Sequence, residues 1–107
     1  MGNFDEFLAV LKDKVSTLVS ELKQYKDAAA KDANSFLEDT RADLERWTRL
    51  LAQGELSGDE FQWLLSARLD LAKMVALKQA GLAKAKLDRF RKSLLDALTS
   101  TALRVFK

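Results

Sequence analysis

The sequence predicts an all-α protein, built as one domain over residues 1–107 from two long helices folded into an antiparallel hairpin. Two observations support this prediction. The 107-residue chain has no proline and only four glycines, and it is rich in alanine, leucine and charged residues that favour helices. Two uninterrupted stretches of similar length flank one short segment that is marked by Gly54 and Gly58.

The first helix is expected over residues 4–52. Asn3 is its predicted N-cap, and Glu6, three residues later, is placed to complete a capping box. Small or apolar residues then recur about every 3.6 residues, which is the α-helical period. This series keeps its phase throughout, at Phe4, Phe7, Leu11, Val15, Leu18, Leu22, Tyr25, Ala29, Ala33, Phe36, Thr40, Leu44, Trp47 and Leu51.

The turn is expected over residues 53–57. Gly54 can take the left-handed conformation that ends a helix. Ser57 and Glu60 match a capping box, and Leu56 and Phe61 match the hydrophobic staple that accompanies it. The second helix should therefore run over residues 58–106.

Antiparallel pairing of these helices predicts a rod about 73 Å long, at about 1.5 Å per residue. In this register Trp47 lies opposite Trp63, and the two rings close the end of the hairpin beside the turn. Phe7 lies near Phe106 at the other end.

A compact bundle formed by one chain is the alternative. Ser35 and Glu38, just after Asp32, match a further capping box, and Gly81 costs its helix about 1 kcal/mol relative to alanine. Breaks at both sites would produce four shorter helices. The hairpin is preferred because the apolar series keeps its phase from residue 29 to residue 36.

A hairpin of two helices cannot enclose a core, so part of each apolar stripe would face water. We therefore expect a homodimer, in which two hairpins form an antiparallel four-helix bundle. The candidate self-association residues are Phe36, Leu44, Trp47, Trp63, Leu64, Leu71, Met74, Leu82 and Leu95.

The chain has neither cysteine nor histidine, which removes the commonest catalytic nucleophile–base pairs and the usual zinc and haem ligands. Acidic residues are densest where arginines interleave with them at helical spacing, so a self-paired solvated face is favoured over a metal or acid–base site. The expected pairs are Glu38–Arg41, Asp43–Arg46 and Glu45–Arg49. No enzymatic activity, cofactor, metal or small-molecule substrate is expected.

Charge is divided unevenly along the chain. Residues 1–53 hold ten acids and eight bases, whereas residues 54–107 hold six acids and ten bases. We interpret this division as complementary charge between the two helices. The densest basic group is a candidate contact surface for phosphates of nucleic acid or anionic lipid, and it consists of Lys84, Lys86, Arg89, Arg91 and Lys92.

The expected function is a non-enzymatic structural or protein-interaction module that self-associates through its amphipathic helices. Two alternatives are a helical protein that binds lipid or storage-granule surfaces, and a weak electrostatic binder of nucleic acid. The sequence lacks the pattern of a signal peptide and any apolar run of membrane-spanning length, so a cytoplasmic protein is expected.

Overall fold

A computed structural model describes residues 3–107, which form five α-helices and one short 3-10 helix, and it confirms the all-α prediction. The elements are α1 (Phe4–Ser20), η1 (Lys23–Tyr25), α2 (Lys26–Ala52), α3 (Gly58–Leu71), α4 (Val75–Gln79) and α5 (Lys84–Phe106).

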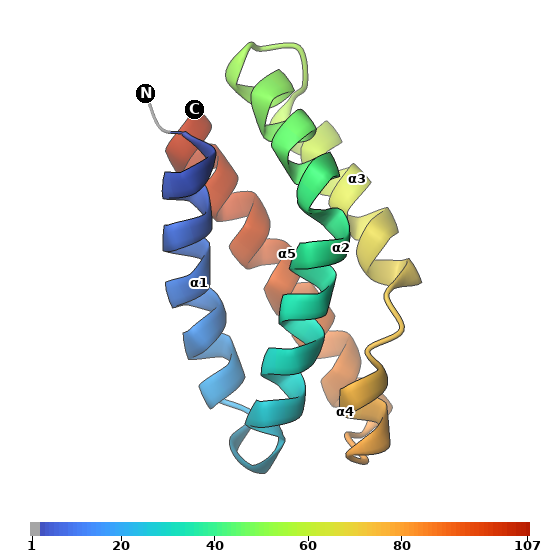
Figure 1. Ribbon diagram of the computed structural model, residues 1–107. Helices are drawn as coiled ribbons and strands as arrows, with labels where there is room; N and C mark the ends of the chain where they lie inside the picture. Colours follow the sequence, from blue (N-terminus) through green and yellow to red (C-terminus); the bar gives the residue numbers. More distant parts are fainter. Residues whose placement is uncertain (1–2) are drawn as a thin grey trace.

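The helices pack side by side in an up-and-down bundle, in which α3 and α4 follow one another along a single line and together take the place of one helix (Figure 1). α5 packs against α1, α2 and α3. The start of α1 and the end of α5 meet at one end of the bundle, where the ring centroids of Phe7 and Phe106 are 5.8 Å apart. The predicted proximity of these two rings is therefore confirmed.

The prediction of two continuous helices over residues 4–52 and 58–106 is wrong. The bundle measures 42 × 23 × 19 Å, far shorter than a rod of two unbroken helices. The chain instead has the shape of the compact alternative, with one of its two breaks at the expected place. Gly81 ends a helix, whereas α2 runs unbroken through Asp32–Ser35.

The first break occurs at residues 21–25, where the chain reverses direction between α1 and α2. Lys23 lies in the left-handed region, at φ 52°, a conformation that costs a non-glycine residue roughly 1–2 kcal/mol. The reversal lets α1 and α2 bury their apolar stripes against each other and against α5. Each buried leucine or phenylalanine is worth about 1.5–3 kcal/mol, so this burial outweighs the strain at Lys23.

The second expected helix breaks twice, at residues 72–74 and around Gly81. Met74 has a φ of 50° and precedes α4. After α4, the amide of Gly81 donates to the carbonyl of Lys78, and the amide of Leu82 donates to the carbonyl of Leu77. This pair of bonds, with Gly81 at φ 87°, is a Schellman C-cap, and the buried Leu77 and Leu82 supply its usual apolar contact.

The predicted cap residues of α1, α2 and α3 are confirmed. Asn3 accepts a hydrogen bond from the amide of Glu6 at 2.8 Å, but among the described residues the Glu6 side chain does not accept from the Asn3 amide, so the capping box predicted there is incomplete. Gly54 has a φ of 75° and ends α2. The amide of Ser57 donates to Glu60 Oε1 at 2.9 Å, and the amide of Glu60 donates to Ser57 Oγ at 3.1 Å, which makes a full capping box.

This capping box predicts a pH dependence. The backbone amide of Ser57, followed by its hydroxyl, lowers the pKa of Glu60 from its ordinary value of 4.5. A depressed pKa adds stability above the ordinary value, and that stability is lost as pH falls through the folded-state pKa. We expect Glu60→Gln to unfold at lower urea than the wild type at neutral pH, with the gap closing in acid. A gap that stays constant across the titration would contradict this explanation.

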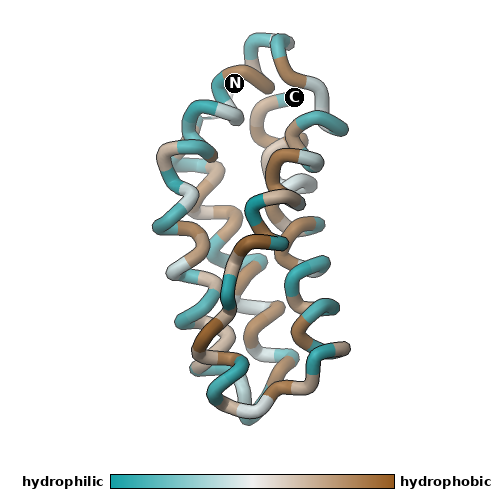
Figure 2. Tube along the Cα trace, turned by 90° about the vertical axis from the view of Figure 1, so that its right-hand side faces the viewer, coloured by the Kyte–Doolittle hydropathy of each residue, from teal (hydrophilic) through white to brown (hydrophobic). Residues whose placement is uncertain are grey.

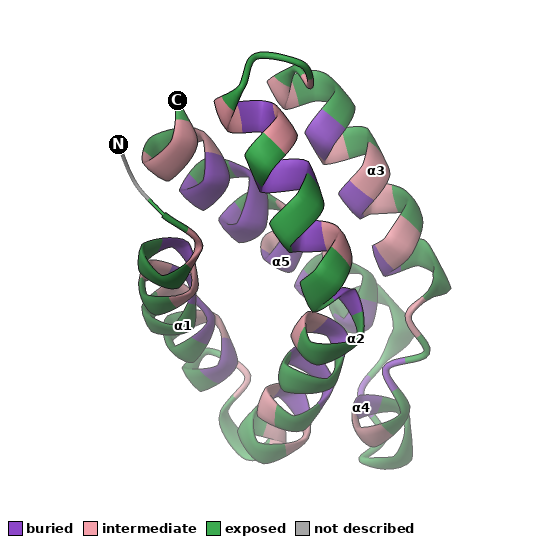
Figure 3. Ribbon diagram, turned by 45° about the horizontal axis from the view of Figure 1, so that its top comes forward, coloured by how far each residue is buried: buried purple, intermediate pink, exposed green. Residues whose placement is uncertain are grey.

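The core lies between the helices and contains most of the large apolar side chains, and the buried residues in Figure 3 mark where it lies. In α5, residues Ala97, Leu98, Thr99, Thr101 and Ala102 are all buried, because this segment has neighbours on several sides. A single chain therefore shelters its own core, and most of the apolar stripe from which the dimer was expected is buried within residues 3–107.

Candidate functional site

The residues expected to mediate self-association divide into two groups. Phe36, Leu44, Trp47, Met74 and Leu82 are buried in the core of one chain, each with an exposed fraction of 8% or less. They are unavailable to a partner unless the bundle opens, so their assignment to an interface between chains is corrected.

The remaining candidates lie toward solvent. Leu64 and Leu95 are half-buried. Trp63 is 71% exposed and Leu71 is 78% exposed. The expected plug of Trp47 against Trp63 is wrong, because Trp47 is buried while Trp63 projects outward. The chain reverses between α1 and α2, so the register of the long hairpin does not apply.

Trp63 and Leu71 belong to an exposed apolar row on α3 and α4. The row consists of Trp63, Ala67, Leu71 and Val75, spaced four residues apart, and all four are exposed. Because residues spaced four apart form one ridge along a helix surface, Trp63, Ala67 and Leu71 share a ridge of α3. Val75 follows the break at residues 72–74 and begins α4. Trp63, Leu71 and Val75 are the large hydrophobic side chains that the described part of the chain leaves exposed. Figure 2 views the bundle from the α3–α4 side and colours it by hydropathy.

A groove adjoins the C-terminal end of this row. It has a volume of about 600 Å³ and lies between the first half of α2 and the segment from Arg68 to Gln79. Leu71, Val75 and Met74 line it from one side, and Phe36 and Thr40 line it from the other. The groove thus offers an apolar recess beside the most exposed apolar side chains of the molecule.

Two charged side chains from other helices form hydrogen bonds with the backbone at the break between α3 and α4, which forms one side of this groove. Asp32 is only 7% exposed, and its carboxylate accepts hydrogen bonds from the amides of Ala76 at 3.0 Å and Leu77 at 2.7 Å. From α5, the Arg91 guanidinium donates to the carbonyl of Ala72. These contacts satisfy backbone groups that the break in the helix leaves unpaired.

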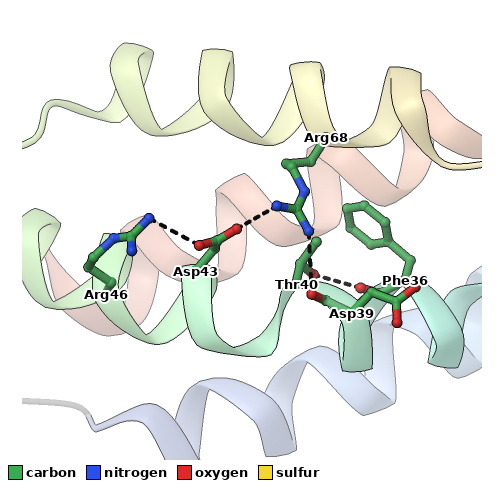
Figure 4. A network of polar contacts seen from close by, with 6 residues as sticks. All are labelled: Phe36, Asp39, Thr40, Asp43, Arg46 and Arg68. Atoms are coloured by element: carbon green, nitrogen blue, oxygen red, sulfur yellow. Dashed lines mark hydrogen bonds and ion pairs between the residues drawn. The ribbon is translucent and has the colours of Figure 1, made fainter.

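A second polar network ties α3 to α2, and it includes Arg68 and Asp39, which also line the groove (Figure 4). Arg68 donates to Asp43 Oδ2 at 2.6 Å and to the carbonyl of Asp39 at 3.3 Å, and Arg46 donates to Asp43 Oδ1 at 3.0 Å. The predicted Asp43–Arg46 pair is confirmed.

The other two predicted pairs on this acidic face, Glu38–Arg41 and Glu45–Arg49, are absent from the ion pairs found within residues 3–107. Sequence spacing gave no indication of Arg68, which reaches Asp43 from the neighbouring helix.

The basic group of α5 does not act as one surface. Arg91 is engaged internally, with Ala72 and, at 3.6 Å, with Asp88. Lys84, Lys86, Arg89 and Lys92 are exposed. Of these four, Lys86 and Arg89 line a second pocket, which lies beside the α1–α2 reversal at the end of the fold opposite the central turn, whereas Lys84 and Lys92 do not line it (Figure 1).

The described residues contain no cluster of three or more potential metal-ligating histidine, cysteine or carboxylate side chains. Within residues 3–107, none of the helices has both the length and the apolar character that a membrane span requires. Comparisons of the chain with protein-family models, with curated proteins and with solved structures gave no match.

Proposed function

We propose that this chain is a non-enzymatic, cytoplasmic protein-interaction module that pairs with a second copy of itself through the exposed row on α3 and α4. The observation behind the proposal is the exposed ridge of Trp63, Ala67 and Leu71 on α3, with Val75 exposed at the start of α4. An exposed apolar ridge on a helix suits contact with another helix. Covering of the core does not require a second copy, because one chain buries it.

Charge along the row favours an antiparallel pairing of two copies. Its N-terminal end carries Glu55, Asp59 and Glu60, all exposed. Its C-terminal end carries exposed Lys73 and Lys78, where Asp70 is the one acid between residues 68 and 79. Two copies related by a two-fold axis would bring the acidic end of each row beside the basic end of the other. Such self-complementarity is what a two-fold contact needs.

The spacing of the row defines the centre of this pairing. An axis through Ala67 sets Trp63 of one copy beside Leu71 of the other. Alanine at the crossing point allows the two helices to approach closely. The large indole ring would then reach the groove lined by Leu71 and Val75, and a tryptophan seated in a pocket is typical of a binding hot spot.

Size exclusion coupled to light scattering, run over a range of concentrations, tests the proposal. The wild type should approach twice the chain mass of 12.0 kDa as concentration rises. Trp63→Glu should weaken pairing by roughly 30-fold or more, as expected for the loss of about 2 kcal/mol at a hot spot. Ala9→Glu, at an exposed position on α1, is the matched control and should dimerise like the wild type.

Two outcomes count against the proposal. A wild-type chain that keeps the mass of a monomer up to millimolar concentration would exclude self-association. A dimer that survives Trp63→Glu unchanged would show that the chains meet through another face.

A further inference from the structure

The second pocket lies where the α1–α2 reversal meets the start of α5. It has a volume of about 460 Å³, within the range of about 300–1,000 Å³ that is typical of small-molecule sites. Leu18 and Leu22 line it from α1 and the turn, and Leu82 and Phe90 line it from the other side. Leu82 and Phe90 are 7% and 4% exposed, so the lining includes part of the packed core.

Three cations surround this apolar lining. Lys23 comes from the reversal, and Lys86 and Arg89 come from α5. Lys86, Arg89 and Ser93 are spaced three and four residues apart, which places them on one face of the helix. Glu21 is the one acid in the lining, so the pocket carries a net positive charge.

These cations are not neutralised by the fold. The ion pairs within residues 3–107 involve Asp43 and Asp88, and none includes Lys23, Lys86 or Arg89. The first turn of α5 has no acid, although the positive end of a helix dipole favours one over the lysines found there. Lys23, Lys86 and Arg89 are exposed and without an ion-pair partner among residues 3–107, so all three are free to contact an anion at the rim of this apolar recess.

From this arrangement we infer that the pocket binds a small anionic amphiphile, with a carboxylate or phosphate head held by Lys86, Arg89 and Lys23 and an apolar tail against Leu82 and Phe90. Arg89 supplies a planar fork of donors that matches either head group. The apolar lining favours such a ligand over a free inorganic anion, because an inorganic anion has no apolar surface to bury against it. The inference is independent of the self-association proposed above, because the pocket shares no residue with the exposed row.

The test is a titration followed by NMR of the isotope-labelled full chain, with octanoate as the probe. Octanoate has both a head and a tail, 1-octanol has the tail alone, and acetate has the head alone. Octanoate should produce saturable shifts in the amides of Lys23, Tyr25 and Phe90, and it should bind at least ten-fold more tightly than either control. Octyl phosphate in a parallel titration establishes which head group is preferred.

Matched variants on one helix separate the pocket from general surface charge. Arg89→Gln should lower octanoate affinity about ten-fold, whereas Lys92→Gln removes the same charge outside the pocket and should change it less than two-fold. An equal loss in the two variants would overturn the inference, since it would mean that α5 acts only as a cationic surface. Equal binding of octanoate and 1-octanol, or no saturable shift with octanoate, would also overturn it.

Discussion

Replacing Asp32 with alanine is expected to lower the free energy of unfolding by about 2–4 kcal/mol. The carboxylate is buried and accepts from the amides of Ala76 and Leu77, the second of which lies in a buried environment. Alanine would leave both amides without a protein partner, and the amide of Leu77 would be left unpaired in a buried environment. Urea unfolding at neutral pH measures the loss.

Asp32→Asn is the control for this prediction. Asparagine keeps one acceptor oxygen of nearly the same shape, so about half of the effect should remain. A loss below about 0.5 kcal/mol for alanine, which is typical of surface substitutions, would mean that water or another group satisfies these amides. The α4 segment would then not depend on α2 for its position.

Replacing Phe61 with alanine is expected to cost about 3–5 kcal/mol, the range for truncating a buried aromatic side chain. Phe61 is fully buried, whereas Trp63, two residues later on the same helix, is 71% exposed. Trp63→Ala should therefore change the stability of the monomer by no more than about 0.5 kcal/mol. Both variants are measured by urea unfolding at a concentration low enough to keep the chain monomeric.

This pair of variants separates folding from association. Phe61→Ala should destabilise the chain at every concentration, and Trp63→Ala should matter only where copies pair. A large loss for Trp63→Ala in the dilute chain would place its indole ring in the core, against the exposure described above.

Local signals in the sequence were enough to predict those helix ends that are capped by residues close in sequence. Asn3, Gly54, Ser57 and Glu60 all cap helices as expected, because each cap depends on contacts within a few residues. Gly81 was recognised as a possible break for the same reason.

The reversal at Lys23 and the break at Met74 had no local signal. Both residues are left-handed without being glycine, so burial elsewhere in the fold offsets their strain. The apolar series also continues at helical spacing across the reversal, from Leu22 to Tyr25. Because of this continuity, the pattern predicted one helix where the structure has two. Periodicity shows which positions face a core, but it does not show whether that core belongs to one chain or two.

The candidate site was predicted only in part. Trp63 and Leu71 were named from their place in the apolar stripe, but Ala67 and Val75 were missed because their exposure depends on the packing of other helices. Asp32 lies just before the capping box that Ser35 and Glu38 match, and its sequence neighbours indicate no distant partner. Its carboxylate caps α4, a contact across 44 residues of sequence that no local pattern encodes.

Disulfide cross-linking at Ala67 is the most direct test of the proposed pairing. The chain has no cysteine, so Ala67→Cys introduces a single thiol at the predicted two-fold axis. Two such thiols can bridge only when their Cα atoms lie within about 7 Å. We expect Ala67→Cys to form a covalent dimer rapidly under mild oxidation, while Ala9→Cys on α1 stays monomeric. Cross-linking that is no faster at Ala67 than at Ala9 would contradict it.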